Sequence, residues 1–298
     1  MSSRKAKQIY IFIAIGVLYF AGISAILYPM VSNIISLSSS KTSITDYVDT
    51  VRNLPDDKIY QMKEDAHKHN ENLANGKFDD GLDTSLCDSN GVLGYVDVPS
   101  IGVYLPIYYE ATDDNLAKGC AVLKNTSLPV GGESTHSVIS AHTGLPTAEM
   151  FTKLDQVKEG EVFHIHVLDE TLAYKVIGIY TVSPDITKKL EIVRGKDYCT
   201  LLTCTPYGIN DKRLLVRGER VPYEPEENPT EQTVSESTDN AADEGLRQEI
   251  RHQITIVAGI VIVSIIVYIF ALIWLMRSLR SAAKEEPEEE NGVDEETD

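Results

Sequence analysis

The chain has 298 residues, of which 43% are hydrophobic, so it is long enough and apolar enough to bury a sizeable core. Its formal net charge is −18, but residues 223–252 contain nine acidic residues against two arginines, and residues 284–298 contain nine against one lysine. Such acid-rich stretches with few aromatic residues are typical of solvated linkers and tails. Because the remainder has no basic stripe interleaved with aromatic residues, the sequence argues against nucleic-acid binding.

The first predicted element is an apolar helix near the N-terminus. No charged residue occurs between Lys7 and Lys41, and residues 9–30, which follow a short segment at 1–8, are long enough to cross a bilayer. A cleaved signal peptide is the competing interpretation, since small residues at 36–40 would allow cleavage, but its apolar region is usually shorter. We therefore expect a transmembrane helix or signal anchor.

A helical arm and a loop are predicted next. Residues 31–75 are expected to form the arm, because helix-compatible residues dominate from position 42 onward and the spacing of Ile59, Met62 and Ala66 suits one apolar face, with a break at Pro55. Residues 76–91 (GKFDDGLDTSLCDSNG) are rich in Gly, Asp, Ser and Asn, which predicts a loop.

Between residues 92 and 221 the hydrophobic period changes to two. Val103, Leu105 and Ile107 alternate with other residues, and a second alternating run at 163–167 is followed by a turn and a further strand-like run. Repeated short strands separated by turn signals predict an all-β fold, a closed or nearly closed barrel.

The C-terminal part repeats the pattern of a span and a charged flank. An acidic linker at 222–253 leads to an uninterrupted apolar segment at 254–276, which is the second predicted transmembrane helix, and residues 277–298 form an acidic tail. Basic residues lie at the distal side of both spans. The positive-inside rule therefore predicts that both termini are cytoplasmic and that the barrel lies outside the cell membrane.

Three residues of the barrel region have the chemistry of a nucleophilic site. Cys204 ends one predicted strand and Arg213 begins the next, so the thiol and the guanidinium are expected at one rim of the barrel. Arg213 would favour a thiolate and donate to an oxyanion, although Arg217 has the same strand parity. His142 ends another strand before a Gly- and Pro-containing loop, which suits a proton carrier.

The segment TLLTCTPYGINDKRLLVRG resembles the signature of the class C, pilin-polymerising sortases of Gram-positive bacteria, in which an arginine follows the cysteine by nine residues. LPVGGESTHSVISAHTGLP resembles the histidine segment of the same family, and EGEVFHIHVLDETLAYKV its following hairpin. The resemblance covers residues 91–220 and extends to the arm, barrel and C-terminal span. It implies a sortase-like closed barrel of about eight strands, with Cys204 as nucleophile, His142 as general acid and base, and Arg213 as the group that stabilises the substrate carbonyl.

The resemblance also implies a reaction and its partners. Cys204 would cleave an LPxTG-like sorting signal near the C-terminus of a pilin and retain the acyl group as a thioester. A lysine amine of another pilin subunit would then resolve it to an isopeptide bond, which extends the fibre. The implied partners are pilin subunits and the membrane.

One feature departs from the family pattern. Many members have an Asp-Pro-aromatic lid in the loop before the barrel, and this chain has no such triplet. Phe78 with Asp79 or Asp80 is the candidate substitute, and a flexible connector is the equally favoured alternative.

Several other polar residues have simpler interpretations. Cys120 and Cys199 are expected to be buried free thiols rather than a disulfide, and Glu133 and His136 are expected to be loop residues. The pair at His164 and His166 shares a strand face without an evident third metal ligand, so a solvated face is favoured. We expect no cofactor and no metal.

Two alternative functions remain open on the sequence. A housekeeping sortase would use the same nucleophile to attach proteins to cell-wall precursor, although the C-terminal span and the TLLTCTPYG form favour the pilin enzyme. A membrane-anchored, non-enzymatic scaffold for surface proteins would not require the Cys, His and Arg set. A hydrolytic cysteine protease is a further option, distinguished by whether water or an amine resolves the thioester.

Overall fold

The computed structural model describes residues 3–77, 86–185, 188–224 and 236–284. These residues form two compact units. One contains the described residues through Tyr28 and from Ile254 onward, and the other is Pro29–Gln253. The second unit holds the barrel and the three candidate catalytic residues.

The first unit is built from the apolar parts of two long helices, α1 (Ser3–Arg52) and α4 (Glu236–Lys284). Each has a stretch long and apolar enough to cross a membrane, since an 18-residue window reaches a mean hydropathy of 2.3 within Ile9–Arg52 and of 3.1 within Gly245–Ser278. Their apolar side chains point outward, as Leu18 and Trp274 do at 72% and 70% exposure. Such a surface suits lipid better than water.

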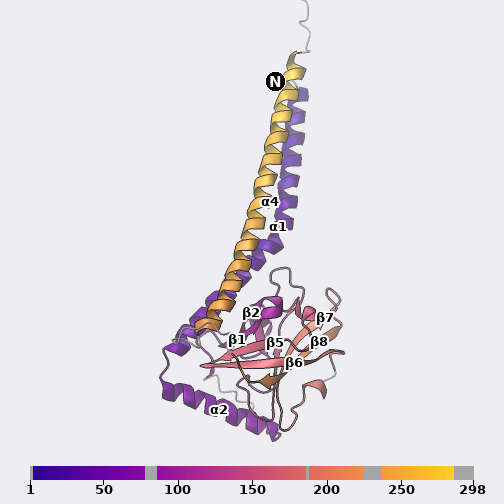
Figure 1. The fold of residues 1–298 in the computed structure, drawn as a ribbon. Coiled ribbons are helices and arrows are strands. Elements are labelled where there is room, and N and C mark those ends of the chain that lie inside the picture. The colour runs from indigo at the N-terminus through magenta and orange to yellow at the C-terminus, as the bar shows by residue number, and fades with distance from the viewer. Residues whose placement is uncertain (1–2, 78–85, 186–187, 225–235, 285–298) are drawn as a thin grey trace, which may run out of the picture. The chain divides into compact units, whose positions relative to one another are not determined.

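The second unit is dominated by a closed barrel, as the sequence predicts (Figure 1). The strands neighbour one another in the order β1-β2-β3-β4-β7-β8-β6-β5. Their bounds are β1 Val92–Val98, β2 Val103–Tyr108, β3 Cys120–Val122, β4 Thr135–Ser140, β5 Val162–Val167, β6 Glu170–Val182, β7 Asp197–Thr205 and β8 Lys212–Val221. The short helical elements are α3 Asp113–Leu116 and the 3₁₀ turns Pro99–Ile101, Leu154–Gln156 and Lys188–Leu190.

The barrel is buried on its outside as well as its inside where α1 passes β1 and β2. Every residue of these two strands is buried, because one side faces the interior while Tyr95, Tyr104 and Tyr108 pack with Ile44 and Tyr47 of α1. The helical arm therefore forms part of the core of this unit.

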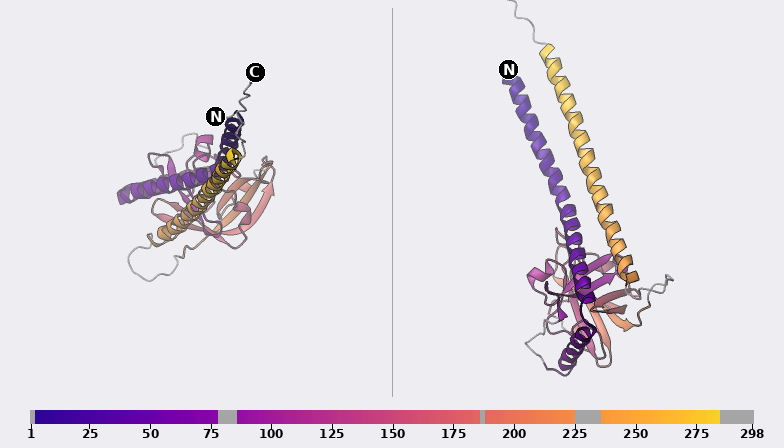
Figure 2. Two further views of the ribbon diagram at one scale, coloured as in Figure 1. Left: turned by 90° about the horizontal axis from the view of Figure 1, so that it is seen from above. Right: turned by 90° about the vertical axis from the view of Figure 1, so that its left-hand side faces the viewer.

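The arm consists of two helices separated at Pro55, where the sequence predicts the break. The second helix, α2 (Asp56–Ala74), lies across one end of the barrel (Figures 1 and 2). Asn70 fixes it there, since its Nδ2 donates to the carbonyl of Leu128 at 3.0 Å and its Oδ1 accepts from the same residue's N–H at 2.7 Å. Lys63 forms ion pairs with Asp169 and Glu170 in the β5–β6 turn.

The expectation of a solvated face at His164 and His166 is wrong. Their register partners on β1 are Asp97 and Tyr95. His166 is 6% exposed and stacks on the Tyr95 ring at a centroid distance of 4.2 Å, and the Nδ1 of His164 lies 3.6 Å from an Asp97 carboxylate oxygen. The face is therefore covered and not solvated, with His166 buried against Tyr95 and His164 partly buried beside Asp97.

Candidate active site

The candidate site forms where three neighbouring strands end or begin. β7 pairs in parallel with β4 and antiparallel with β8, so β7 lies between the other two. The far end of these strands, where Thr135 pairs with Asp197, is the end that α2 covers. The carboxyl ends of β4 and β7 therefore lie at the opposite rim.

Cys204 and Arg213 are direct partners across the β7–β8 pair. Directly opposed residues point to the same face and have Cβ atoms about 4.5–5.5 Å apart. Arg217, which sequence parity leaves as an alternative, instead opposes Thr200. The register thus places Arg213, and not Arg217, beside the thiol.

His142 follows β4 and reaches the same rim. The parallel ladder pairs Ser140 with Leu202. It continues beyond the strand because Ala141 N–H donates to the Leu202 carbonyl at 3.1 Å, and the Thr203 hydroxyl donates to the Ala141 carbonyl at 2.8 Å. Continued by one more step, this register would pair His142 with Cys204.

The three candidate catalytic side chains are more exposed than the other two cysteines of the barrel. His142, Cys204 and Arg213 are partly exposed. Cys120 and Cys199 are fully buried free thiols, as expected, and burial raises the pKa of each thiol. Because the thiolate is the nucleophilic form, those two sites are unreactive, whereas Cys204 is accessible to a substrate.

Arg213 is held at the start of β8 by its own turn. Its Nη1 donates to the carbonyls of Asn210 at 3.2 Å and Lys212 at 3.0 Å. A guanidinium carries five N–H groups and remains charged at any ordinary pH. It therefore has donors left for an oxyanion on a carbonyl attacked by the neighbouring thiol.

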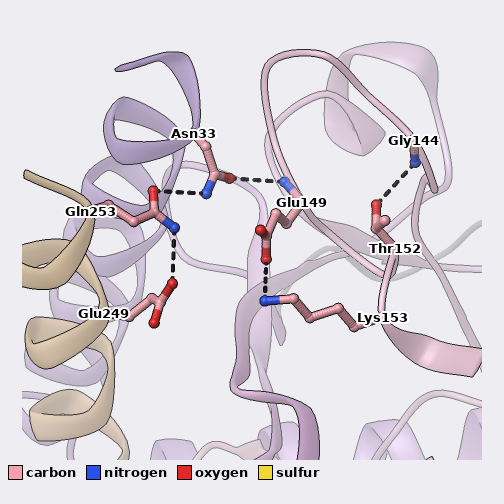
Figure 3. Close-up of polar contacts among 7 residues, drawn as sticks. All are labelled: Asn33, Gly144, Glu149, Thr152, Lys153, Glu249 and Gln253. Carbon is pink, nitrogen blue, oxygen red and sulfur yellow. Dashed lines mark hydrogen bonds and ion pairs between the residues drawn. The ribbon is translucent and has the colours of Figure 1, made fainter. Parts of the chain in front are cut away.

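The loop after His142 folds back on the histidine. The N–H of Phe151 donates to the His142 carbonyl at 3.0 Å, and the N–H of Gly144 donates to the Thr152 hydroxyl at 3.0 Å (Figure 3). Phe151 is fully buried in the barrel core. The loop is thus closed upon itself rather than extended.

Tyr207, in the β7–β8 connection, contacts this histidine loop. A Cβ placed on Gly144 would lie 3.0 Å from its ring, and the ring itself is 69% exposed. The sequence does not single out this residue, because the loop spacing gives no sign of the contact. The two connections that flank Cys204 therefore touch each other.

His136 is not a loop residue, contrary to the sequence-based expectation. It lies fully buried in β4, with Nδ1 3.0 Å from the Glu191 carbonyl and Nε2 2.7 Å from the Thr200 hydroxyl. Burial lowers its pKa to about 4, and the charge of Arg217 acts in the same direction. A neutral, fully bonded imidazole stabilises the sheet here and is not a proton carrier at neutral pH.

The candidate lid residues Phe78, Asp79 and Asp80 lie outside the described residues. Within the part of the chain that the structure describes, no group of three or more His, Cys, Asp or Glu side chains is arranged to hold a metal ion.

Comparison with known proteins identifies the fold. A family model described as the sortase domain matches residues 96–221. A solved structure of Clostridium perfringens sortase C with the C-terminal cell wall sorting motif is 49% identical, covers 61% of this chain and 99% of that chain, and superposes with a TM-score of 0.58. A Streptococcus pneumoniae sortase C is 43% identical, with 60% and 96% covered and a TM-score of 0.56.

A more distant relative matches a smaller share. Sortase A of Bacillus anthracis is 30% identical over 136 residues, which is 45% of this chain and 62% of that protein, so less than two thirds of its length is spanned. The two solved structures, by contrast, are covered almost completely and at higher identity. We conclude that this chain belongs to the sortase family of cysteine transpeptidases.

Proposed function

We propose that this chain is a class C sortase that cleaves an LPxTG-like sorting signal and transfers the acyl group to a lysine of a pilin subunit. The observation that carries the proposal is the register that puts Cys204 opposite Arg213 and next in line to His142. Similarity to sortase C structures supports the class, and the structure of the Streptococcus pneumoniae sortase C bears on the pilin substrate specificity of that enzyme.

The first half of the reaction is an acylation. The thiolate of Cys204 attacks the carbonyl carbon of the threonine in the signal, and the negative charge that develops on the carbonyl oxygen is stabilised by N–H groups of Arg213. His142 donates a proton to the departing glycine nitrogen as the peptide bond breaks. The products are a Cys204 thioester and a peptide with a free amino terminus.

The second half reverses the roles. His142, now neutral, takes a proton from the incoming lysine amine, which attacks the thioester carbon. The carbon–sulfur bond breaks, an isopeptide bond forms, and the thiolate is regenerated. Arg213 again faces the oxygen that carries the charge.

The two apolar helices suit an enzyme held at the cell membrane. We place both termini in the cytoplasm and the barrel outside, because basic residues flank the distal ends of both spans. On this placement the N-terminal span is an uncleaved anchor at residues 9–30, and the segments 222–253 and 277–298 are an outer linker and an inner tail.

The test uses the full chain in detergent micelles with an LPxTG peptide and a pilin domain, followed by intact-mass spectrometry. Wild-type protein should gain the mass of the acyl fragment and then yield a lysine-linked product. Cys204→Ala should form neither. Cys199→Ala is the matched control, since it removes a buried thiol from the same strand and should still form the adduct.

Other outcomes would point to other functions. Release of the fragment by water, without a lysine product, would indicate a hydrolase, and transfer only to a cell-wall precursor amine would indicate the housekeeping enzyme. If Cys204→Ala were to form the product as well as wild type, the proposed nucleophile would be wrong. The absence of any adduct on wild type would favour the binding scaffold.

A further inference from the structure

Asn33 is a buried polar residue on α1, shortly after the predicted membrane span. It is only 8% exposed, and both ends of its carboxamide are bonded. Oδ1 accepts from the backbone N–H of Glu149 at 2.9 Å, and Nδ2 donates to Oε1 of Gln253 on α4 at 3.2 Å (Figure 3). One side chain therefore joins two helices to a loop of the barrel.

That loop is the one that carries His142. Glu149 stands two residues before Phe151, whose N–H bonds the His142 carbonyl, and three before Thr152, which holds Gly144. The Glu149 side chain makes an ion pair with Lys153 at 2.8 Å. The Asn33 bond thus fixes the returning half of the loop immediately before the contacts that hold the histidine.

The orientation of the Asn33 amide is itself determined. Gln253 Nε2 donates to the Glu249 carboxylate at 3.0 Å, so its oxygen is the end that faces Asn33. An amide oxygen can only accept, which requires the NH₂ of Asn33 to point to Gln253 and its oxygen to point to Glu149. The carboxylate of Glu249 therefore sets the direction of the whole series (Figure 3).

We propose that Asn33 is a positioning residue for His142, acting through its hydrogen bond to the Glu149 N–H. The inference rests on the proposed role of His142 as proton carrier. Proton transfer requires the imidazole within hydrogen-bond reach of the reacting nitrogen, and a misplacement of about 1 Å can cost up to about 100-fold in rate. Because this bond holds the backbone of the histidine loop, we expect its loss to affect turnover more than affinity.

The experiment measures kcat and KM for a sorting-signal peptide with the full chain in detergent micelles. Asn33→Ala should lower kcat about tenfold and leave KM within about twofold, with the rate expressed per folded molecule from a thermal melt. Asn33→Leu is the second variant, because it keeps the volume, forms helix well and lacks both polar ends. It should show the same loss of kcat, and it replaces Asn33→Ala in the test if the alanine variant does not fold.

Two matched controls separate this bond from its neighbours. Gln253→Ala removes the bond from Asn33 to α4 and the bond to Glu249 but leaves the Asn33 oxygen as acceptor for the Glu149 N–H. Glu149→Ala removes the ion pair with Lys153 while keeping the backbone N–H. Both should retain kcat within about threefold of wild type. Asn33→Asp combined with Gln253→Ala, which keeps an acceptor for the Glu149 N–H and removes the Gln253 oxygen that would oppose a carboxylate, should recover most of the rate.

The outcomes distinguish this inference from the proposed function. If wild type is active and Asn33→Leu turns over as fast as wild type per folded molecule, the positioning role is wrong. The same holds if both controls lose as much as Asn33→Ala, since general loosening would then explain the loss. Inactive wild type, or active His142→Ala, would instead overturn the proposed function.

Discussion

Arg213 and Arg217 show how strand register assigns chemistry to individual residues. Both side chains point to the same face of β8, but Arg213 opposes Cys204, whereas Arg217 opposes Thr200, four residues further from the rim. Arg217 donates to the Lys189 carbonyl and lies over the rings of Tyr180 and Tyr198. Arg217 therefore serves packing, whereas Arg213 lies beside the proposed nucleophile.

This difference predicts opposite effects of the same substitution. Arg213→Ala should lower kcat/KM for the sorting peptide by about 100- to 1000-fold, the usual cost of removing an oxyanion donor. Arg217→Ala should lower the melting temperature and leave kcat/KM within a few-fold. Steady-state kinetics and thermal melts on the two variants check both effects, and equal losses of activity would contradict the assignment.

At the scale of elements, the barrel could be predicted from alternating residues and turn signals, and the rim position of Cys204 and Arg213 followed from their places at strand ends. Which side chains neighbouring elements bury could not be predicted. The period of β1 and β5 is visible in the sequence, but not that they pair and thereby bury His166. Likewise, nothing local at Asn33 indicates a partner 116 residues away.

The contact between the two loops beside Cys204 leads to a prediction on Gly144. Its φ of +71° is in the left-handed region, and an added Cβ would lie 3.0 Å from the Tyr207 ring. Gly144→Ala should therefore cost about 1–2 kcal/mol from the backbone alone and should also displace Tyr207 and lower kcat.

Gly160→Ala is the control for this substitution. Gly160 also has positive φ, at +93°, but no atom within 4 Å of the added Cβ. It should lose stability by a similar amount without loss of kcat. Kinetics and denaturant unfolding of the two variants test this, and a full rate in Gly144→Ala would show that the contact with Tyr207 is dispensable.

At the scale of the whole molecule, buried histidines make the barrel sensitive to acid. Burial lowers the pKa of His136 to about 4, and burial with the nearby charge of His164 lowers that of His166 to about 3, both from an ordinary value of 6.5. Below pH 6.5 the unfolded chain takes up these protons before the folded one does. The free energy of unfolding therefore decreases as the pH is lowered from about 6.5 to 4.

Each histidine should contribute a slope of up to about 1.4 kcal/mol per pH unit in this window. His136→Gln and His166→Gln should each reduce the slope of unfolding free energy between pH 6.5 and 5, although each loses stability at pH 7. Denaturant unfolding followed by near-ultraviolet circular dichroism measures this slope. Slopes identical to wild type in both variants would rule out these groups as its source.

The pairing of β7 with two different neighbours also suggests an order in which the site assembles during folding. Cys204 and Arg213 belong to one hairpin, and such local contacts form early. The contact of Ala141 with Thr203 spans 62 residues and needs a parallel crossover, so it closes late. We therefore expect a folding chain to bring its thiol and arginine together before the histidine arrives, and to stay inactive until the barrel has closed.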